Sequence, residues 1–172
     1  MVGVNQRHVE IRPVEESDRP TVEWLTTHLW GACEVIVHEG VFYPAILPGF
    51  IAERSGRIAG LVTFDVRPGV LEIVTINALD LYKGIGTLLV EAVRAEAKRL
   101  GCHQVTLTTT NDNIGALRFY QRRGFRLAAI RPGAVDRSRQ RKPEIPRNGD
   151  FGIPLRDEID LACPVLSGKK IQ

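Results

Sequence analysis

The sequence predicts an α/β (α+β) domain, and two observations carry this prediction. Residues 50–54 and 58–66 have the composition of strands and are joined by a Ser-Gly-Arg turn, which is typical of an antiparallel hairpin. Residues 70–130 then alternate strand, helix, strand, helix and strand, as expected where helices cover a sheet. With 172 residues, of which 44% are hydrophobic, the chain has the make-up of one domain over residues 1–172.

The N-terminal elements are a strand and a helix. Val9 and Ile11 partly alternate with charged residues, which favours a first strand. Ser17 and Asp18 then offer an N-cap for a helix. The apolar positions of this helix are Val22, Trp24, Leu25 and Leu29. We assign no element to residues 31–49.

The most apolar predicted strand covers residues 70–76. It is rich in β-branched residues on both faces, as a central buried strand is, and Glu72 is its charged exception. A helix with one apolar face follows the glycines of the next turn and ends at Gly101. The later elements are a strand over 104–109, a helix over 113–123 and a strand over 125–130. Residues 131–158 contain four prolines and many charges, so we expect a long functional or mobile connection before a last strand near 158–166.

Composition excludes several classes of protein. A balance of 23 basic and 20 acidic residues gives a net charge of +3, so no general attraction to nucleic acid or anionic membranes is expected. Cys33, Cys102 and Cys163 are too scattered for a disulfide framework or a metal site, which favours a reducing compartment. The N-terminus lacks the apolar run of a secretory signal, and no segment approaches the roughly 20 apolar residues that span a bilayer. We therefore expect a cytoplasmic protein without a metal.

A glycine-containing turn joins the apolar strand to its helix. Lys83-Gly84-Ile85-Gly86-Thr87 lets the backbone approach a ligand while the first helical N–H groups point outwards, which favours phosphate binding. A Walker loop requires a lysine after its second glycine, but here the lysine precedes both glycines. A dinucleotide fingerprint requires a third small residue, where Leu89 stands. Neither of these two phosphate motifs fits.

Two segments resemble the GNAT acetyltransferases. Residues 81–86 are similar to the family pattern Arg/Gln-x-x-Gly-x-Gly/Ala, except that Leu81 replaces the Arg or Gln and removes a side-chain contribution. Residues 113–125, Asn-x-x-Ala-x-x-Phe-Tyr-x-x-x-Gly-Phe, are similar to the second family hallmark at the right distance downstream. The resemblance implies a mixed, mostly antiparallel twisted sheet of about seven strands flanked by about four helices, with acetyl-CoA as co-substrate.

The resemblance also implies the roles of individual residues. Tyr120 would protonate the departing CoA thiolate, and Glu72 on the apolar strand is the candidate general base. A backbone N–H between Ile76 and Ala78 would stabilise charge on the thioester oxygen. The implied cofactor-binding residues are Ile76, Asn77, Ala78, Tyr82, Lys83, Gly84, Ile85, Gly86, Thr87, Asn113 and Tyr120.

The functional hypothesis is transfer of an acetyl group from acetyl-CoA to a primary amine by direct attack, without a covalent enzyme intermediate. The acceptor is an amine on a small molecule or on a protein, and homodimerisation stays open. A first alternative is a non-catalytic acyl-CoA-binding or sensing module, motivated by Leu81 and by the undetermined base. A second alternative is nucleic-acid binding through the basic segments, whereas we attribute Arg118, Arg122 and Arg123 to a solvated helix face.

Overall fold

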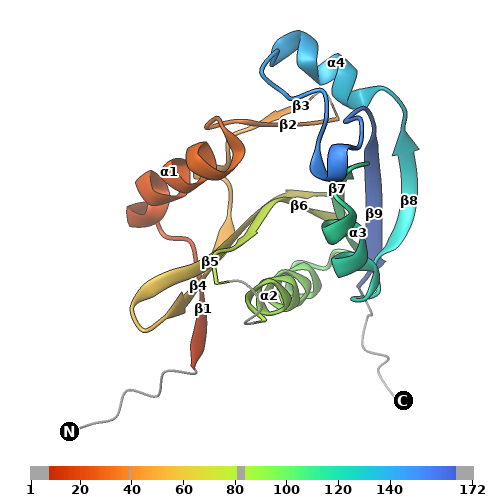
Figure 1. The fold of residues 1–172 in the computed structure, drawn as a ribbon. Helices are drawn as coiled ribbons and strands as arrows, with labels where there is room; N and C mark the ends of the chain where they lie inside the picture. Colours follow the sequence, from red (N-terminus) through yellow and green to blue (C-terminus); the bar gives the residue numbers. More distant parts are fainter. Residues whose placement is uncertain (1–7, 39, 81–83, 166–172) are drawn as a thin grey trace, which may run out of the picture.

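A seven-stranded sheet forms the centre of the molecule in the computed structural model, which describes residues 8–38, 40–80 and 84–165 (Figure 1). The strand order is β1-β4-β5-β6-β7-β9-β8, and neighbouring strands are antiparallel except for the parallel pair β6–β7. The strands are β1 (Val9–Pro13), β4 (Gly49–Arg54), β5 (Arg57–Arg67), β6 (Val70–Ala78), β7 (Gln104–Thr110), β8 (Arg126–Arg131) and β9 (Glu158–Pro164). The predicted mixed, mostly antiparallel sheet is confirmed.

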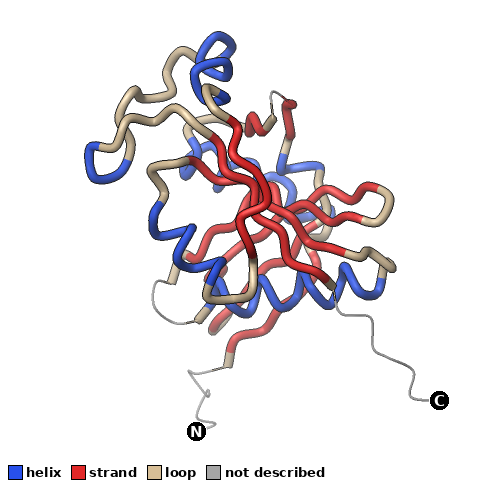
Figure 2. The backbone as a smooth tube through the Cα atoms, turned by 90° about the vertical axis from the view of Figure 1, so that its right-hand side faces the viewer, coloured by secondary structure: helices blue, strands red, loops and turns tan. Residues whose placement is uncertain are grey.

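Four α-helices lie in the described part of the chain, as the sequence predicted. They are α1 (Arg19–Trp30), α2 (Ile85–Arg99), α3 (Ile114–Gln121) and α4 (Ala134–Arg141). Because successive side chains of a strand point to opposite faces, adjacent residues show which helix covers which face. Ile51 and Leu61 pack with Val22 of α1, whereas Ala52 and Val62 belong to the cluster that contains the buried face of α2. The twisted sheet therefore has a helix on each face (Figure 2).

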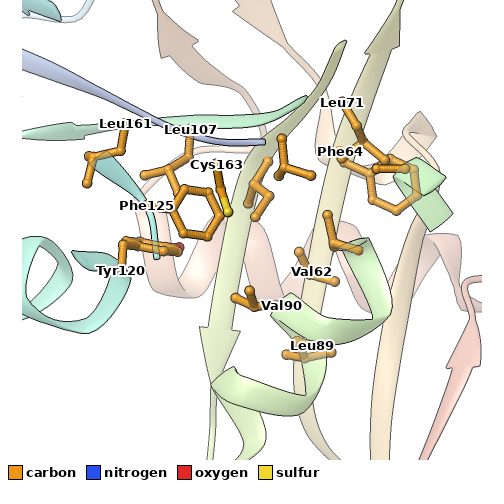
Figure 3. Close-up of a cluster of buried hydrophobic side chains, with 14 of the residues drawn as sticks. Val62, Phe64, Leu71, Leu89, Val90, Leu107, Tyr120, Phe125, Leu161 and Cys163 are labelled. Carbon is orange, nitrogen blue, oxygen red and sulfur yellow. The ribbon is translucent and has the colours of Figure 1, made fainter. Parts of the chain in front are cut away.

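The larger core lies between the sheet and helices α2 and α3. Leu89, Val90 and Val93 of α2 are fully buried against strands β4 to β7. Tyr120 of α3 packs in the same cluster with Phe125, and the rings of these two residues meet edge to face (Figure 3). The two helices that carry the predicted motifs are thereby fixed on one face of the sheet.

Strands β6 and β7 separate part of the way along their length. Their pairing runs from Val70 opposite Gln104 to Ile73 opposite Leu107 and then stops, although both strands continue. At the same point the register of β6 on β5 shifts, so that Val74 is an extra residue of β6. Such a bulge increases the local twist and bends the strand. The centre of the sheet is therefore open beyond Ile73, and we call this opening the splay.

Two regions for which the sequence predicted no regular structure contain helices or strands. Residues 31–49 form the hairpin of β2 (Val35–Val37) and β3 (Gly40–Phe42), followed by a short 3-10 turn. Residues 131–158 are not one irregular connection, because α4 lies within them and Ala134 and Val135 are buried. Periodicity does not detect three-residue strands or a helix with so few apolar residues. None of the described helices is long and apolar enough to cross a membrane.

We expect Leu89→Ala to lower the free energy of unfolding by about 2–5 kcal/mol, because it leaves a cavity beneath a fully buried side chain. Leu88 is the matched control, since it is the preceding residue of α2 and is 41% exposed. Leu88→Ala should cost under about 0.5 kcal/mol. Urea unfolding followed by circular dichroism measures both values, and equal losses would contradict the assigned face of α2.

Candidate active site

A cavity of about 300 Å³ occupies the splay between β6 and β7. It is lined by Leu29, Trp30, Ile73, Val74, Ile76, Asn77, Leu107, Thr108, Thr109, Asn113, Ala116 and Tyr120. These residues come from α1 on one face of the sheet, from α3 on the other face and from the separated strands. The cavity therefore extends between the two faces, and we call it the splay cavity.

Tyr120 lies at the α3 side of the splay cavity and is 4% exposed. Burial raises the pKa of its hydroxyl well above the ordinary value, and the charge of Arg123 lowers it only in part. No described residue donates or accepts a hydrogen bond at this hydroxyl. Tyr120 is thus a neutral O–H group with a free bonding position in a cavity, which is the form a proton donor requires.

Asn113 fixes the start of α3 beside Tyr120. Its side-chain oxygen accepts a hydrogen bond from the backbone N–H of Ala116 at 3.0 Å, so the residue is the N-cap of this helix. Asn113 also lines the splay cavity. Asn113 therefore caps α3 and lines the cavity at the same time.

The predicted segment 76–78 lies only partly in the cavity wall. Ile76 and Asn77 line the cavity, whereas Ala78 pairs with Gly60 of β5 and does not line it. The Asn77 side-chain oxygen accepts a hydrogen bond from Trp30 Nε1 at 3.1 Å, which connects the end of α1 to β6. The sequence interpretation assigned no site role to Trp30, because an aromatic residue on an amphipathic helix usually belongs to the core.

Different structural requirements explain why glycine stands at each of the two motif positions, 84 and 86. Gly84 is the N-cap of α2 with φ of 77°, in the left-handed region, and a Cβ there would meet no atom of the described residues within 4 Å. A Cβ on Gly86 would lie 3.1 Å from the ring of Phe119, so Gly86 makes room for that ring. Ile85 is 1% exposed, so only its backbone can face a ligand. The predicted residues Tyr82 and Lys83, and Leu81, lie outside the described residues.

A basic groove of about 640 Å³ adjoins the first turn of α2. It is lined by Thr87, Gly115, Arg118, Phe119, Arg122 and Arg123. Arg123 stacks at 3.6 Å on the ring of Phe119 and donates a hydrogen bond from Nε to Thr87 Oγ1 at 3.1 Å. Burial, followed by the charges of Arg122 and Arg94, lowers the pKa of Arg123.

Arg118 and Arg122 are exposed, as the predicted solvated helix face requires, whereas Arg123 is half-buried against the Phe119 ring. A guanidinium beside other cations and beside the positive end of a helix is electrostatically unfavourable. A bound anion would relieve this repulsion. The 3.6 periodicity placed Arg118, Arg122 and Arg123 on one predicted helix over 113–123, which in the structure ends at Gln121. It contained no information on the α2 terminus opposite them.

Glu72 is 5% exposed and does not line the splay cavity. Its carboxylate forms an ion pair with Arg67 of β5. It lines a neighbouring cavity of about 480 Å³, the polar basin, on the face of the sheet opposite α2. Leu107 and Thr108 line both cavities, so the two adjoin along β7.

The polar basin also contains a hydrogen-bonded group that the sequence did not predict. His38, at the tip of the β2–β3 hairpin, lies 2.7 Å through Nε2 from Asp160 Oδ1 and 2.8 Å from Thr108 Oγ1. The Arg131 Nε donates to Asp160 Oδ2 at 2.9 Å. Glu158 is 4% exposed, and burial raises its pKa more than the backbone N–H of His38 lowers it.

Comparison with known proteins identifies one family of enzymes. The sequence model of the acetyltransferase (GNAT) family matches residues 11–125. The Bacillus subtilis protein YdhI, described as uncharacterized, is 42% identical over 131 residues, which cover 76% of this chain and 82% of YdhI.

Two solved structures illustrate the similarity in fold. A B. subtilis acetyltransferase in complex with CoA has a TM-score of 0.69 at 24% identity, covering 92% of this chain and 100% of its own. A GNAT family acetyltransferase from Elizabethkingia anophelis with acetyl-CoA bound has a TM-score of 0.65 at 20% identity, covering 94% and 99%.

We expect Glu158→Gln to stabilise the protein more at pH 8 than at pH 5. Burial raises the pKa of Glu158 above its ordinary value of 4.5, so its contribution to stability is fully present below that value and is lost as pH rises through the folded-state pKa. A glutamine does not ionise, so the variant does not lose stability in this way as the pH rises. Thermal unfolding of Glu158→Gln, wild type and the exposed control Glu144→Gln measures the effect, and a difference that does not change with pH would contradict it.

Proposed function

The chain belongs to the acetyltransferase (GNAT) family, and from this premise and the splay cavity we propose that it transfers an acetyl group from acetyl-CoA to a primary amine. The observation that carries the proposal is the position of the neutral Tyr120 hydroxyl in a cavity between two separated strands, beside the glycine-capped start of α2. Family membership supports acetyl transfer in general. The amine acceptor and the residue roles are our inference.

The phosphates of acetyl-CoA would bind at the start of α2. Backbone N–H groups of the first turn of a helix, with the positive end of its dipole, bind anions. The empty space at Gly84 leaves that turn accessible to a ligand. Arg118, Arg122 and Arg123 across the groove supply positive charge where Leu81 replaces the Arg or Gln of the family pattern.

The acyl-pantetheine arm would then enter the splay cavity. Strand β6 has no β7 partner beyond Ile73, so its edge at Ile76 and Asn77 faces the cavity. A backbone N–H on this edge could donate to the thioester oxygen as negative charge develops there. The carbonyl carbon would thereby lie between this edge and Tyr120.

Amine attack requires a free lone pair on nitrogen, and the sulfur leaves as a thiolate. Tyr120 is proposed as the general acid that protonates this sulfur. Glu72 remains the candidate base from the sequence, although its ion pair with Arg67 lies outside the splay cavity. A single domain over residues 1–172 that works without a metal is also part of the proposal.

We expect saturating acetyl-CoA to raise the thermal unfolding temperature, since a ligand at about 100 times its dissociation constant stabilises the native state by roughly 2.7 kcal/mol. Arg122→Gln should weaken binding by about 10- to 100-fold, the loss of one charged hydrogen bond. Calorimetric titration measures both proteins. The exposed Arg57, at the start of β5, is the matched control.

An unchanged affinity in Arg122→Gln would exclude this residue from the phosphate site. If acetyl-CoA left the unfolding temperature of wild type unchanged, the proposed function itself would be overturned. If acetyl-CoA raised the unfolding temperature but primary amines caused no thiol release, the non-catalytic acyl-CoA-binding alternative would be favoured instead.

We expect Tyr120→Phe to lower kcat by roughly 10- to 1,000-fold while acetyl-CoA affinity changes little, because the phenyl ring keeps the packing and only the acidic O–H is lost. Thiol release measured with Ellman's reagent gives the rate. Tyr43→Phe is the control, since Tyr43 is 51% exposed and lies outside the splay cavity. A rate equal to wild type in Tyr120→Phe would exclude the general-acid role.

A further inference from the structure

The splay cavity lacks a proton acceptor. Among its described lining residues Tyr120 is the one titratable side chain, and burial keeps it in the acid form. A primary amine carries a proton at neutral pH and cannot attack a thioester in that form. A base for the proposed reaction must therefore lie in a neighbouring part of the molecule.

The polar basin is the nearest place for such a base, because it adjoins the splay cavity at Leu107 and Thr108. His38 is separated from the splay cavity by one side chain, since Thr108 lines that cavity and its Oγ1 lies 2.8 Å from His38 Nε2. Figure 1 shows the β2–β3 hairpin extending from the end of α1 towards β9. His38 has φ of 51°, a left-handed conformation that histidine adopts more readily than most residues.

The contacts of His38 define which ring nitrogen is free. Asp160 Oδ1 lies 2.7 Å from Nε2 and also accepts from Thr108 Oγ1 at 2.9 Å. Burial alone would raise the pKa of Asp160, but the hydrogen bonds from His38, Thr108 and Arg131 lower it overall, so the group is a carboxylate. A carboxylate accepts only, so Nε2 carries the hydrogen and Nδ1 keeps the lone pair. No described residue hydrogen-bonds to Nδ1.

We propose that His38 Nδ1 is the general base that deprotonates the acceptor amine, in place of Glu72, with Asp160 as its positioning residue. This inference rests on the proposed function. The other charged groups of the basin are paired: Arg67 with Glu72 and Arg131 with Asp160. The buried Glu158 accepts a hydrogen bond from the backbone N–H of His38, so it holds the hairpin rather than the imidazole ring.

The proton balance of the reaction closes with these groups. The ammonium gives one proton to His38 Nδ1 through water in the polar basin, and its freed lone pair forms the bond to the carbonyl carbon. The carbon–sulfur bond breaks, Tyr120 protonates the thiolate, and the second proton of the nitrogen restores the Tyr120 hydroxyl. The imidazolium then releases its proton to solvent, which the 27% exposure of the His38 side chain permits.

The decisive experiment is the pH dependence of kcat/KM for His38→Gln, Glu72→Gln and wild type, each as the full chain. The probe is the best substrate for wild type among ethylamine, spermidine, lysine and an alanyl hexapeptide, with acetyl-CoA. We expect His38→Gln to lose about 100-fold or more in kcat/KM at pH 7, with unchanged acetyl-CoA affinity. The pH profile of wild type should show a rising limb that is absent from His38→Gln, because glutamine has no group that can accept the proton.

Asp160→Asn and His103→Gln complete the design. Asp160→Asn should also lower kcat/KM, because an amide does not fix the Nε2–H tautomer, and long-range nitrogen–proton spectra of the imidazole should report the other tautomer. His103 is exposed and does not line either cavity, so His103→Gln should match wild type. If the His38 and Asp160 side chains only attach the hairpin, His38→Gln lowers the unfolding temperature but keeps the rising limb.

The possible outcomes separate the two proposals. A rising limb that is kept in His38→Gln and lost in Glu72→Gln would overturn the inference and return the base to Glu72. Absence of thiol release by wild type with all four amines would overturn the proposed acetyl transfer and the inference with it, whereas normal turnover of His38→Gln would overturn the inference alone.

Discussion

The early end of the β6–β7 ladder is the constraint on which the site depends. Parallel strands in the middle of a sheet normally satisfy each other's backbone groups over their whole length. Here pairing stops at Ile73 and Leu107, while both strands continue for several residues. The extra residue Val74 turns β6 away from β7 at that point. Without this divergence, no cavity could connect the two faces of the sheet through its centre.

The helices contribute to the site because the core holds them at the edges of this opening. Buried leucine and valine side chains fix α2 beneath β4 to β7, so its first turn lies beside α3. The cap at Asn113 and the ring contacts of Tyr120 fix α3 in the same way. The site is therefore made rigid by the same contacts that stabilise the fold, as a preorganised site requires.

Much of the fold could be predicted because its strongest local patterns are also its central elements. The apolar run at 70–76 became the central strand β6, and the two amphipathic helices occur where the spacing placed them. The β2–β3 hairpin could not be predicted, since its strands have three residues each and His38 contacts β9 more than a hundred residues later. Local periodicity contains no information on contacts of that separation.

The site shows the same division. The positions of Asn113 and Tyr120 in the cavity wall could be anticipated, because both belong to one short helix and its cap with a recognisable pattern. Trp30, Thr108 and Arg123 could not, because each reaches its position through packing between elements that are distant in sequence. Glu72 was placed on the correct strand, but alternation along β6 and the Arg67 ion pair put its carboxylate in the basin.

Gly86 illustrates how one residue of a sequence motif can meet two structural requirements. Its missing side chain leaves room for the Phe119 ring, which in turn supports the Arg123 guanidinium against Thr87. A substitution at this position would first push α3 away from α2 and only secondarily alter what the helix terminus can bind. The second glycine of the pattern thus lies where two helices pack closely. Its presence in a sequence indicates this close packing as much as it indicates a ligand.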